Sequence, residues 1–387
     1  MKDFIFKMPT RVIFGVNAIE RLKSVLDSYG LGRIMIVTGP HIAKTEEFQT
    51  LLRHLEGEQV EYTVYKDIES DPCIEAVDAS AQKLKESGVD GVVAVGGGSV
   101  IDISKAMCML VTNEGSVRDY LFGGTKTVVH KPLPLIAVPT TAGSGSEVTA
   151  SSVITDNQHD IKLSVTHDFL MPLAAVIDPV MHRGMPPVVT ASTGMDALTH
   201  AMESYVSLNA EPMNEAFAEK AIQLIGENIR KATYDPTNLE ARSNMAIAST
   251  IAAAAFVNGG LGAVHGIAQA MGGVAHTPHG IANALLLPYV MELNIKGTPG
   301  KFAKIARLLG ENTDGCSERE AAEAAVKAVR TLVEDLHIPT KLHELKIPVG
   351  PEMFDTIVKG TMEYRLLSLN PVKVREQDVY EILNKAL

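Results

Sequence analysis

Apolar positions follow two different patterns in the two halves of the chain. In the first half, short β-rich runs alternate with helix-prone stretches. The runs are IMIVT (34–38), VVAV (92–95), LIAV (135–138) and AVI (175–177), and two of the stretches between them are 73–87 and 100–110. Around the second run, a strand, a glycine turn and a helix follow without a break, as GVVAV-GGGS-VIDISKAM. This alternation is typical of a parallel sheet with crossover helices.

The second half reads differently, because β-rich runs disappear and one helical pattern follows another. The expected helices are 190–206, 211–230, 239–256, 263–273, 281–294, 301–308, 317–335 and 374–385. Gly184, Pro186 and Pro187 interrupt the chain between the two patterns. A chain of 387 residues also exceeds what one core usually organises. We therefore expect a Rossmann-like α/β domain over residues 1–183 and an all-helical domain over residues 184–387.

Charge and cysteine usage narrow the classes of partner. The net charge is −11, whereas nucleic acids and anionic membranes are bound by basic surfaces. Cys73, Cys108 and Cys316 are scattered and odd in number, which favours reduced thiols over a disulfide framework. The N-terminal stretch has no continuous apolar region of the secretory kind, and no apolar run is long enough for a membrane span. We expect a cytoplasmic protein without nucleic-acid or membrane partners.

The glycine turn is a candidate phosphate site. Gly96, Gly97, Gly98 and Ser99 lie between a buried strand and a helix. Glycines let a phosphate approach the backbone, and a helix N-terminus favours its negative charge. Asp102, in the first turn of that helix, is a second cofactor candidate that could order the loop or cap its amides. The stretch does not match GxGxxG, so a tight turn without a ligand is the alternative.

A second loop strengthens the case for a nucleotide. VPTTAGSGSEVT (138–149) also follows a buried strand and carries the hydroxyls of Thr140, Thr141 and Ser144. Two such loops at strand ends of one sheet can line the crevice where open α/β sheets bind ligands. Lys162 in DIKLSV is a candidate positive charge. We expect these loops to bind a nucleotide or dinucleotide.

The helical half carries candidate metal ligands. Asp196 and His200 stand four apart in TGMDALTHAMES, a spacing that puts both on one helix face. His265, His276 and His279 follow in a second apolar, glycine-rich stretch. A solvated face and ordinary core histidines would be the simple interpretation. Buried ionisable groups without partners are costly, however, so the combination favours a metal.

The type of ligand limits the type of metal. Imidazoles and one carboxylate suit zinc, iron, cobalt or nickel rather than calcium or magnesium. Four protein ligands would close a tetrahedral zinc site, whereas Fe²⁺ accepts more ligands and keeps an open position. Zinc generally binds such ligands more tightly than ferrous iron, so Zn²⁺ is the alternative to Fe²⁺.

Five motifs in order carry a resemblance to a known family. GGGSVIDISK, PTTAGSGSEVT, GMDALTHAMES, GLGAVHGIAQAMGG and TPHGIANALLLP resemble the iron-containing (group III) alcohol dehydrogenases, which include lactaldehyde reductase and propanediol dehydrogenase. The similarity runs from residue 11 to residue 374. It implies a dehydroquinate-synthase-like nucleotide domain, a helical metal domain and a cleft between them. It also implies that Asp196, His200, His265 and His279 are the metal ligands.

The same resemblance implies a reaction. Hydride would pass between the nicotinamide of NAD or NADP and a short-chain alcohol or aldehyde polarised by Fe²⁺. Asp196 and His265 would then act in catalysis through the metal. A homodimer or larger homo-oligomer is expected, with the RVIFG stretch (11–15) as a candidate strand for cross-subunit pairing.

Two positions depart from the family pattern. Members often have a second histidine four residues after the first one in this stretch, where this chain has Gln269. Because an amide cannot titrate, His276 is our candidate for handling the proton. Several members carry an aspartate after the first long strand, where this chain has Gly39. Losing that carboxylate removes its repulsion of a 2′-phosphate, so we expect NADPH to be tolerated.

The substrate pocket is only loosely predicted. The resemblance places Ser151, Ser152, Phe256 and Asn258 along it, a modest and mixed lining. Small aldehydes and diols fit, as does a short aldehyde with a polar or anionic tail such as lactaldehyde or sulfoacetaldehyde.

Three other interpretations explain less of the sequence. A polyol-phosphate dehydrogenase or dehydroquinate-synthase-type enzyme needs a basic phosphate pocket that the motifs lack. A dinucleotide or metal sensor needs an output segment. A metal hydrolase leaves the glycine loops unexplained.

Overall fold

The computed structural model describes residues 3–68, 72–158 and 161–387. These residues form two compact units, which we describe separately. The α/β unit is Met8–Met185, and the helical unit is Pro186–Leu387 together with residues 3–7. Within the helical unit, Phe6 of the N-terminal segment stacks on Phe217, with ring centroids 5.5 Å apart.

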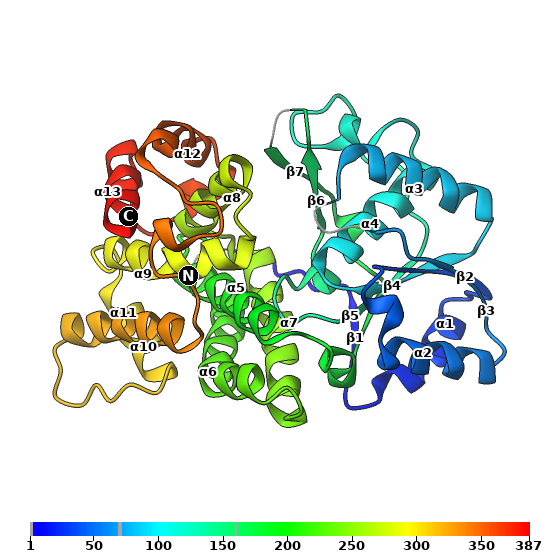
Figure 1. Ribbon diagram of the computed structural model, residues 1–387, viewed down its shortest axis with the longest axis horizontal. Helices are drawn as coiled ribbons and strands as arrows, with labels where there is room; N and C mark the ends of the chain where they lie inside the picture. Colours follow the sequence, from blue (N-terminus) through cyan, green and yellow to red (C-terminus); the bar gives the residue numbers. More distant parts are fainter. Residues whose placement is uncertain (1–2, 69–71, 159–160) are drawn as a thin grey trace. The chain divides into compact units, whose positions relative to one another are not determined.

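The α/β unit contains a six-stranded parallel sheet and a two-stranded antiparallel hairpin (Figure 1). In spatial order, the strands of the sheet are β1 (Arg11–Phe14), β8 (Ala174–Ile177), β5 (Leu135–Pro139), β4 (Gly91–Gly96), β2 (Arg33–Thr38) and β3 (Glu61–Tyr65). The hairpin is formed by β6 (Ser151–Asp156) and β7 (Ile161–Thr166). The four apolar runs of the sequence lie in β2, β4, β5 and β8. The hairpin and the short edge strands β1 and β3 carry a weaker apolar pattern.

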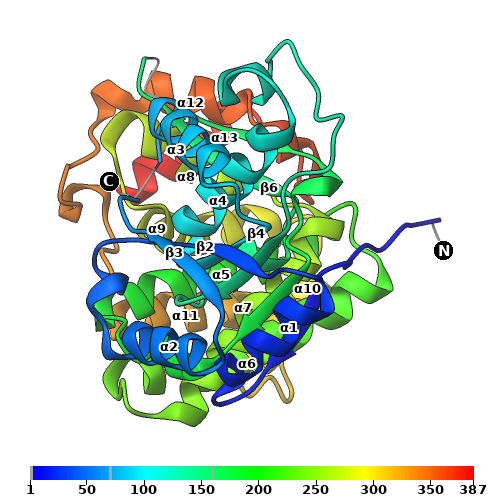
Figure 2. The same cartoon turned by 90° about the vertical axis from the view of Figure 1, so that its right-hand side faces the viewer.

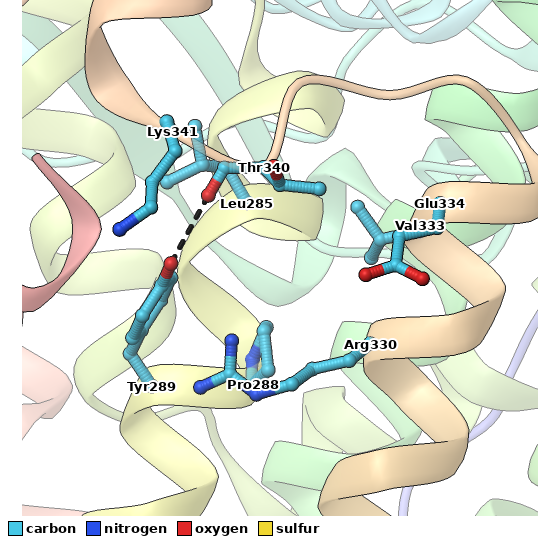
Figure 3. Close-up of a pocket in the computed structure, with 8 residues that line it drawn as sticks. All are labelled: Leu285, Pro288, Tyr289, Arg330, Val333, Glu334, Thr340 and Lys341. Carbon is cyan, nitrogen blue, oxygen red and sulfur yellow. Dashed lines mark hydrogen bonds between the residues drawn. The ribbon is translucent and has the colours of Figure 1, made fainter.

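Helices cover both faces of this sheet, as Figures 1 and 2 show. They are α1 (Leu22–Ser28), α2 (Glu46–Gly57), α3 (Ile74–Ser87) and α4 (Gly98–Thr112). Ile34 and Ile36 of β2 belong to the core formed with α1 and α2, whereas Met35 and Val37 belong to the core formed with α3 and α4. Because successive residues of a strand face opposite sides, burial on both faces requires the continuous apolar runs seen in the sequence.

The order of the strands indicates which edge of the sheet is suited to bind a ligand. After β2 the chain forms β3 on one side of it and then returns to form β4 on the other side. Open α/β sheets bind ligands beyond the carboxyl ends of the strands at such a reversal. The register pairs Thr38 with Val95, and Gly96 with Pro139. The residues that follow β2, β4 and β5 therefore emerge side by side at one edge of the sheet.

All elements of secondary structure described after Met185 are helices. The helices are α5 (Pro187–Val206), α6 (Pro212–Tyr234), α7 (Leu239–Gly259), α8 (Ala263–Ala275), α9 (His279–Asn294), α10 (Pro299–Leu308), α11 (Glu318–Asp335), α12 (Phe354–Met362) and α13 (Glu376–Ala386). Helix α12 is absent from the predicted set, because it is short and contains a glycine. No single helix of the described residues has the length and apolarity of a membrane span; α7 and α8 reach them only as a pair, across a bend of 102°.

Small residues allow close packing around α5. A Cβ atom on Gly194 would lie 2.8 Å from side-chain atoms of both Ile229 and Met245, on α6 and α7. The turn between α7 and α8 is equally tight, since Gly260 has a φ of +82° and a Cβ there would lie 2.3 Å from Leu369. Only glycine fits that conformation and space, so the GGLG sequence fixes where α8 begins.

Candidate functional site

Three helices of the helical unit carry the candidate metal ligands. Asp196 and His200 lie on α5, one turn apart and both buried. His265 lies in the first turn of α8, and His279 is the first residue of α9. The turn from α7 to α8 and the loop from α8 to α9 therefore bring imidazoles to the polar stripe of α5.

One carboxylate oxygen is the centre of this cluster. Oδ1 of Asp196 lies 3.8 Å from Nε2 of His265, 3.8 Å from Nε2 of His279 and 4.0 Å from Nε2 of His200. Two atoms that share a metal at about 2.1 Å each can be no more than about 4.2 Å apart. Asp196, His265 and His279 offer ligand atoms that all lie within 4.8 Å of one another, so one ion could bind all three. His200 approaches the same oxygen of Asp196 but lies outside that group, and its role as a fourth ligand stays a prediction.

Asn283 gives an independent test of whether the residues fit a metal. Its Nδ2 lies 2.7 Å from Oδ1 of Asp196 and 3.2 Å from Nε2 of both His265 and His279. One amide offers two hydrogens to these three acceptors, while its own Oδ1 is buried without a partner among the described residues. The acceptor atoms gathered here outnumber the hydrogen-bond donors, and a bound cation would satisfy the remaining lone pairs. The residues fit Fe²⁺ or Zn²⁺.

The carboxylate of this cluster is ionised. Burial alone would raise the pKa of Asp196, but the neighbouring imidazoles of His200, His279 and His265 and the amide of Asn283 hold that pKa below its ordinary value. Asp196 is therefore available as an anionic ligand.

Sequence reasoning missed two members of this cluster. Asn283 lies four residues after His279, on the same face of α9. Glu203 lies seven residues after Asp196, on the same face of α5, and contacts His265. The helical spacing that pointed to Asp196 and His200 was also the signal for both.

The predicted cofactor loops come together in the α/β unit. Gly39 follows β2, and the backbone N–H of Thr140 donates to the carbonyl of Gly96 at 3.0 Å. A Cβ on Gly97 would lie 3.2 Å from the side chain of Thr141. The loops after β2, β4 and β5 therefore form one surface at the crevice edge of the sheet.

The start of α4 suits a phosphate. Helix α4 begins at Gly98 with Ser99 as its second residue, and its N-cap Gly97 makes no side-chain hydrogen bond to the helix amides. A Cβ on Gly98 would lie 2.7 Å from Oγ of Ser144, so only glycine leaves room for the loop after β5. The amides and dipole of a helix N-terminus attract an anion.

Asp102 and Lys105 of α4 point inward. Oδ2 of Asp102 accepts from the backbone N–H of Val153 at 2.9 Å, and burial raises the pKa of Asp102. Nζ of Lys105 donates to the carbonyls of Thr149 and Ser151 and to Oγ1 of Thr149 at 2.8–2.9 Å. Asp102 thus helps to order the structure behind the loop, and its direct contact with a dinucleotide stays a prediction. Sequence reasoning missed Lys105.

Three further predicted residues lie on the β6–β7 hairpin of the α/β unit. Lys162 is on β7, paired with Thr155 of β6. Ser151 lies on β6, where its hydroxyl pairs with Thr166 at 2.9 Å, and neighbouring Ser152 donates to the carbonyl of Asp102. Roles for Lys162, Ser151 and Ser152 in ligand binding stay predictions.

The predicted residues of the helical unit differ in their contacts. Phe256 stacks on His200 with ring centroids 4.5 Å apart, so it lies beside the metal ligands. Asn258 instead uses its amide on the backbone of Lys7 and on the carbonyl of Ala254. These contacts give no support to its predicted place in the substrate pocket. His276 is exposed and ends α8 in a left-handed conformation, with a φ of 48°.

Comparison with known proteins identifies the family of this chain. The family model "Iron-containing alcohol dehydrogenase" matches residues 9–179, and "Fe-containing alcohol dehydrogenase family, C-terminal" matches residues 190–387. A 1,3-propanediol dehydrogenase of Citrobacter freundii is 37% identical over 99% of this chain and 98% of its own length.

Solved structures show the same fold. A crystal structure of 1,3-propanediol oxidoreductase superposes with a TM-score of 0.95 at 35% identity, over 100% of both chains. A sulfoacetaldehyde reductase from Bifidobacterium kashiwanohense in complex with NAD⁺ has a TM-score of 0.91 at 30% identity, over 100% of this chain and 99% of that one. The expected fold class, a parallel-sheet α/β domain followed by a helical one, is confirmed. The protein is an oxidoreductase that belongs to the iron-containing alcohol dehydrogenase family.

Proposed function

We propose that this protein transfers hydride between a nicotinamide dinucleotide and a short-chain alcohol or aldehyde, using Fe²⁺ held by Asp196, His200, His265 and His279. The observation that carries this proposal is the ring of three imidazole nitrogens 3.8–4.0 Å from one oxygen of Asp196. Zn²⁺ fits the same ligands, and the open position that the reaction needs favours Fe²⁺.

The protein's own groups then have distinct tasks. Asp196 supplies negative charge to the ion, and the imidazoles bind through neutral nitrogens. When bound, the ion polarises the carbonyl and stabilises negative charge on its oxygen. Phe256, stacked on His200, offers an apolar wall that keeps water from part of the site. The amides at the start of α4 hold the pyrophosphate of the dinucleotide.

The reduction balances with one proton. A bound reduced nicotinamide would supply hydride from C4 to the carbonyl carbon, and the oxygen would take up a proton. Gln269 cannot supply that proton, because an amide does not titrate. We propose that exposed His276 delivers it from solvent.

The residue that follows β2 bears on the choice between NADH and NADPH. Gly39 carries no carboxylate to repel a 2′-phosphate. Among residues 3–68, 72–158 and 161–387, a Cβ at this position would meet ordinary contacts, 3.4 Å from the carbonyl of Ile68 and 4.0 Å from Val100. Steric crowding thus does not require glycine at this position. The lack of a carboxylate there supports the use of NADPH as well as NADH.

A neutral short-chain substrate is our first choice. The aromatic ring of Phe256 beside the metal ligands suits an aliphatic body. The names of the relatives include an enzyme for a diol and one for a sulfonated aldehyde. A short aldehyde with a polar or anionic tail is therefore the second choice.

Assembly and compartment follow from other features. The short strand β1 lies at one edge of the sheet, and Phe14 at its end is 37% exposed. Such an edge can pair with a second chain, so we propose a homodimer or larger homo-oligomer, to be checked by light scattering. Cys73, Cys108 and Cys316 are all free thiols, which supports a reducing, cytoplasmic location.

Reconstitution tests the proposed reaction. Protein stripped by a chelator is loaded anaerobically with Fe²⁺ or Zn²⁺, and absorbance at 340 nm is followed with NADH or NADPH. The substrate panel contains propanal, 3-hydroxypropanal, lactaldehyde and sulfoacetaldehyde. We expect Fe²⁺-dependent oxidation of both cofactors, fastest with a neutral aldehyde. Failure of every aldehyde despite stoichiometric binding of metal and cofactor would refute the proposal.

A further inference from the structure

Glu203 is a buried carboxylate beside the metal cluster, with a side chain only 3% exposed. Its Oε2 lies 2.6 Å from Nδ1 of His265, and its Oε1 accepts from the backbone N–H of Val264 at 2.6 Å. Both oxygens are therefore occupied by groups in the first turn of α8. On the other side of the ring, Nδ2 of Asn283 can only donate and lies 3.2 Å from Nε2 of His265, so Nε2 accepts and Nδ1 carries the hydrogen that points to Glu203.

That contact decides how His265 presents its other nitrogen. A neutral imidazole that donates through Nδ1 carries its lone pair on Nε2. Nε2 of His265 is the atom that faces Oδ1 of Asp196 at 3.8 Å. Glu203 thus holds the ring in the tautomer and orientation that a metal requires.

The charges of the cluster are consistent with this role. Asp196 and Glu203 are two buried carboxylates on one face of α5. A divalent cation balances both of them, whereas the loss of Glu203 would leave a net positive charge in a buried place.

The local fold is built around this contact. A Cβ on Gly262 would lie 3.1 Å from Oε1 of Glu203 and 2.8 Å from Oδ1 of Asn370. Only glycine lets the α7–α8 turn approach the carboxylate this closely. The start of α8 also favours a nearby negative charge through its helix dipole.

We propose that Glu203 is a positioning residue that sets the tautomer and orientation of the His265 ring, and through them the affinity of the metal site. This proposal rests on the proposed function, because it takes His265 as a metal ligand. The alternative is that Glu203 only caps the N-terminus of α8.

Glu203→Gln separates these roles. The Val264 N–H and Nδ1 of His265 use different oxygens of Glu203, and in glutamine one of these positions carries an NH2 that cannot accept; the substitution also removes the charge. We expect Zn²⁺ and Fe²⁺ to bind about 10- to 100-fold more weakly, measured by competition with a chromophoric chelator. Thr199→Val is the matched control: Thr199 is also buried on α5, but its hydroxyl only donates to Met195 of the same helix. Its affinity should stay within about twofold of wild type.

A double-mutant cycle tests whether Glu203 affects metal affinity through His265. If Glu203 acts through His265, Glu203→Gln should change affinity less than about threefold in a His265→Ala background. In a His279→Ala background, it should keep its full effect. Melting curves of the metal-free variants check folding, and Glu203→Asp, which keeps the charge but withdraws the oxygens, provides a second variant with an intermediate loss.

The outcomes distinguish the two proposals. Equal losses in both histidine backgrounds, or wild-type affinity in Glu203→Gln, would overturn the role of Glu203 while the proposed function stands. A wild-type protein that binds neither metal would overturn both.

Discussion

Replacing Lys105 by methionine should destabilise the α/β unit without touching its surface. Lys105 is 1% exposed, and its ammonium donates three hydrogen bonds, to Thr149 and Ser151. Methionine has a similar length but no donor, so the carbonyls of Thr149 and Ser151 lose a partner and Asp102 loses its nearest positive charge. Breaking a buried charged network in this way costs roughly 3 to 5 kcal/mol.

The pH dependence of the free energy of unfolding reports on the charge of the Lys105 ammonium. Burial lowers the pKa of Lys105 from 10.5 to about 8, against the attraction of Asp102 and Glu147. The unfolded chain therefore binds more protons than the folded one between these values. The cost of burying the charge is fully present below pH 8 and disappears as the pH rises through 10.5. It amounts to roughly 3 kcal/mol for the shift from 10.5 to about 8.

Differential scanning calorimetry of the full chain can detect both effects. The two units are separate compact bodies, so we expect the transition of the α/β unit to move by roughly 10 °C at pH 7 while the other stays in place. Between pH 8 and 10, the wild type should gain stability over Lys105→Met. Lys83→Met is the control, because Lys83 is 57% exposed and its contacts are worth less than about 1 kcal/mol. A variant as stable as wild type, or a stability difference that does not vary with pH, would refute this account of Lys105.

Three further substitutions test the cofactor and proton sites. Gly98→Ala places a Cβ 2.7 Å from Oγ of Ser144 and should weaken NADH binding at least about tenfold by fluorescence titration, whereas Gly57→Ala, with open space around its Cβ, should leave binding unchanged. Gly39→Asp should lower kcat/KM for NADPH by about 10- to 100-fold and leave NADH nearly unaffected; an equal loss with both cofactors would contradict our interpretation of that position. His276→Asn keeps a residue that tolerates the left-handed backbone and should lower turnover while metal content, measured by mass spectrometry, stays at the wild-type level. Unchanged turnover would exclude His276 from proton transfer.

Local periodicity in the sequence predicts which residues share a face within one helix or one strand. The four central strands were predictable because burial on both faces demands continuous apolar runs. Asp196 and His200 were predictable because a spacing of four fixes a shared helix face. The edge strand β3 has no buried residue and therefore lacks the apolar pattern of the central strands.

Contacts made across long stretches of chain were not predictable. Glu203 meets His265 only because the α7–α8 turn bends by 102°. Asp102 looked like a ligand-facing residue from its place in the first turn of α4. Its partner Val153 lies 51 residues further along the chain, where no local pattern could reveal it.

The most direct test of the central claim is to follow the hydride itself. Metal-loaded and chelator-treated protein are each given NADH deuterated at C4 and a short aldehyde, and the alcohol is analysed by mass spectrometry. The account predicts one deuterium on the carbinol carbon for each cofactor oxidised, and only in the metal-loaded sample. Deuterium released to water, or equal transfer without metal, would contradict metal-dependent hydride transfer by this protein.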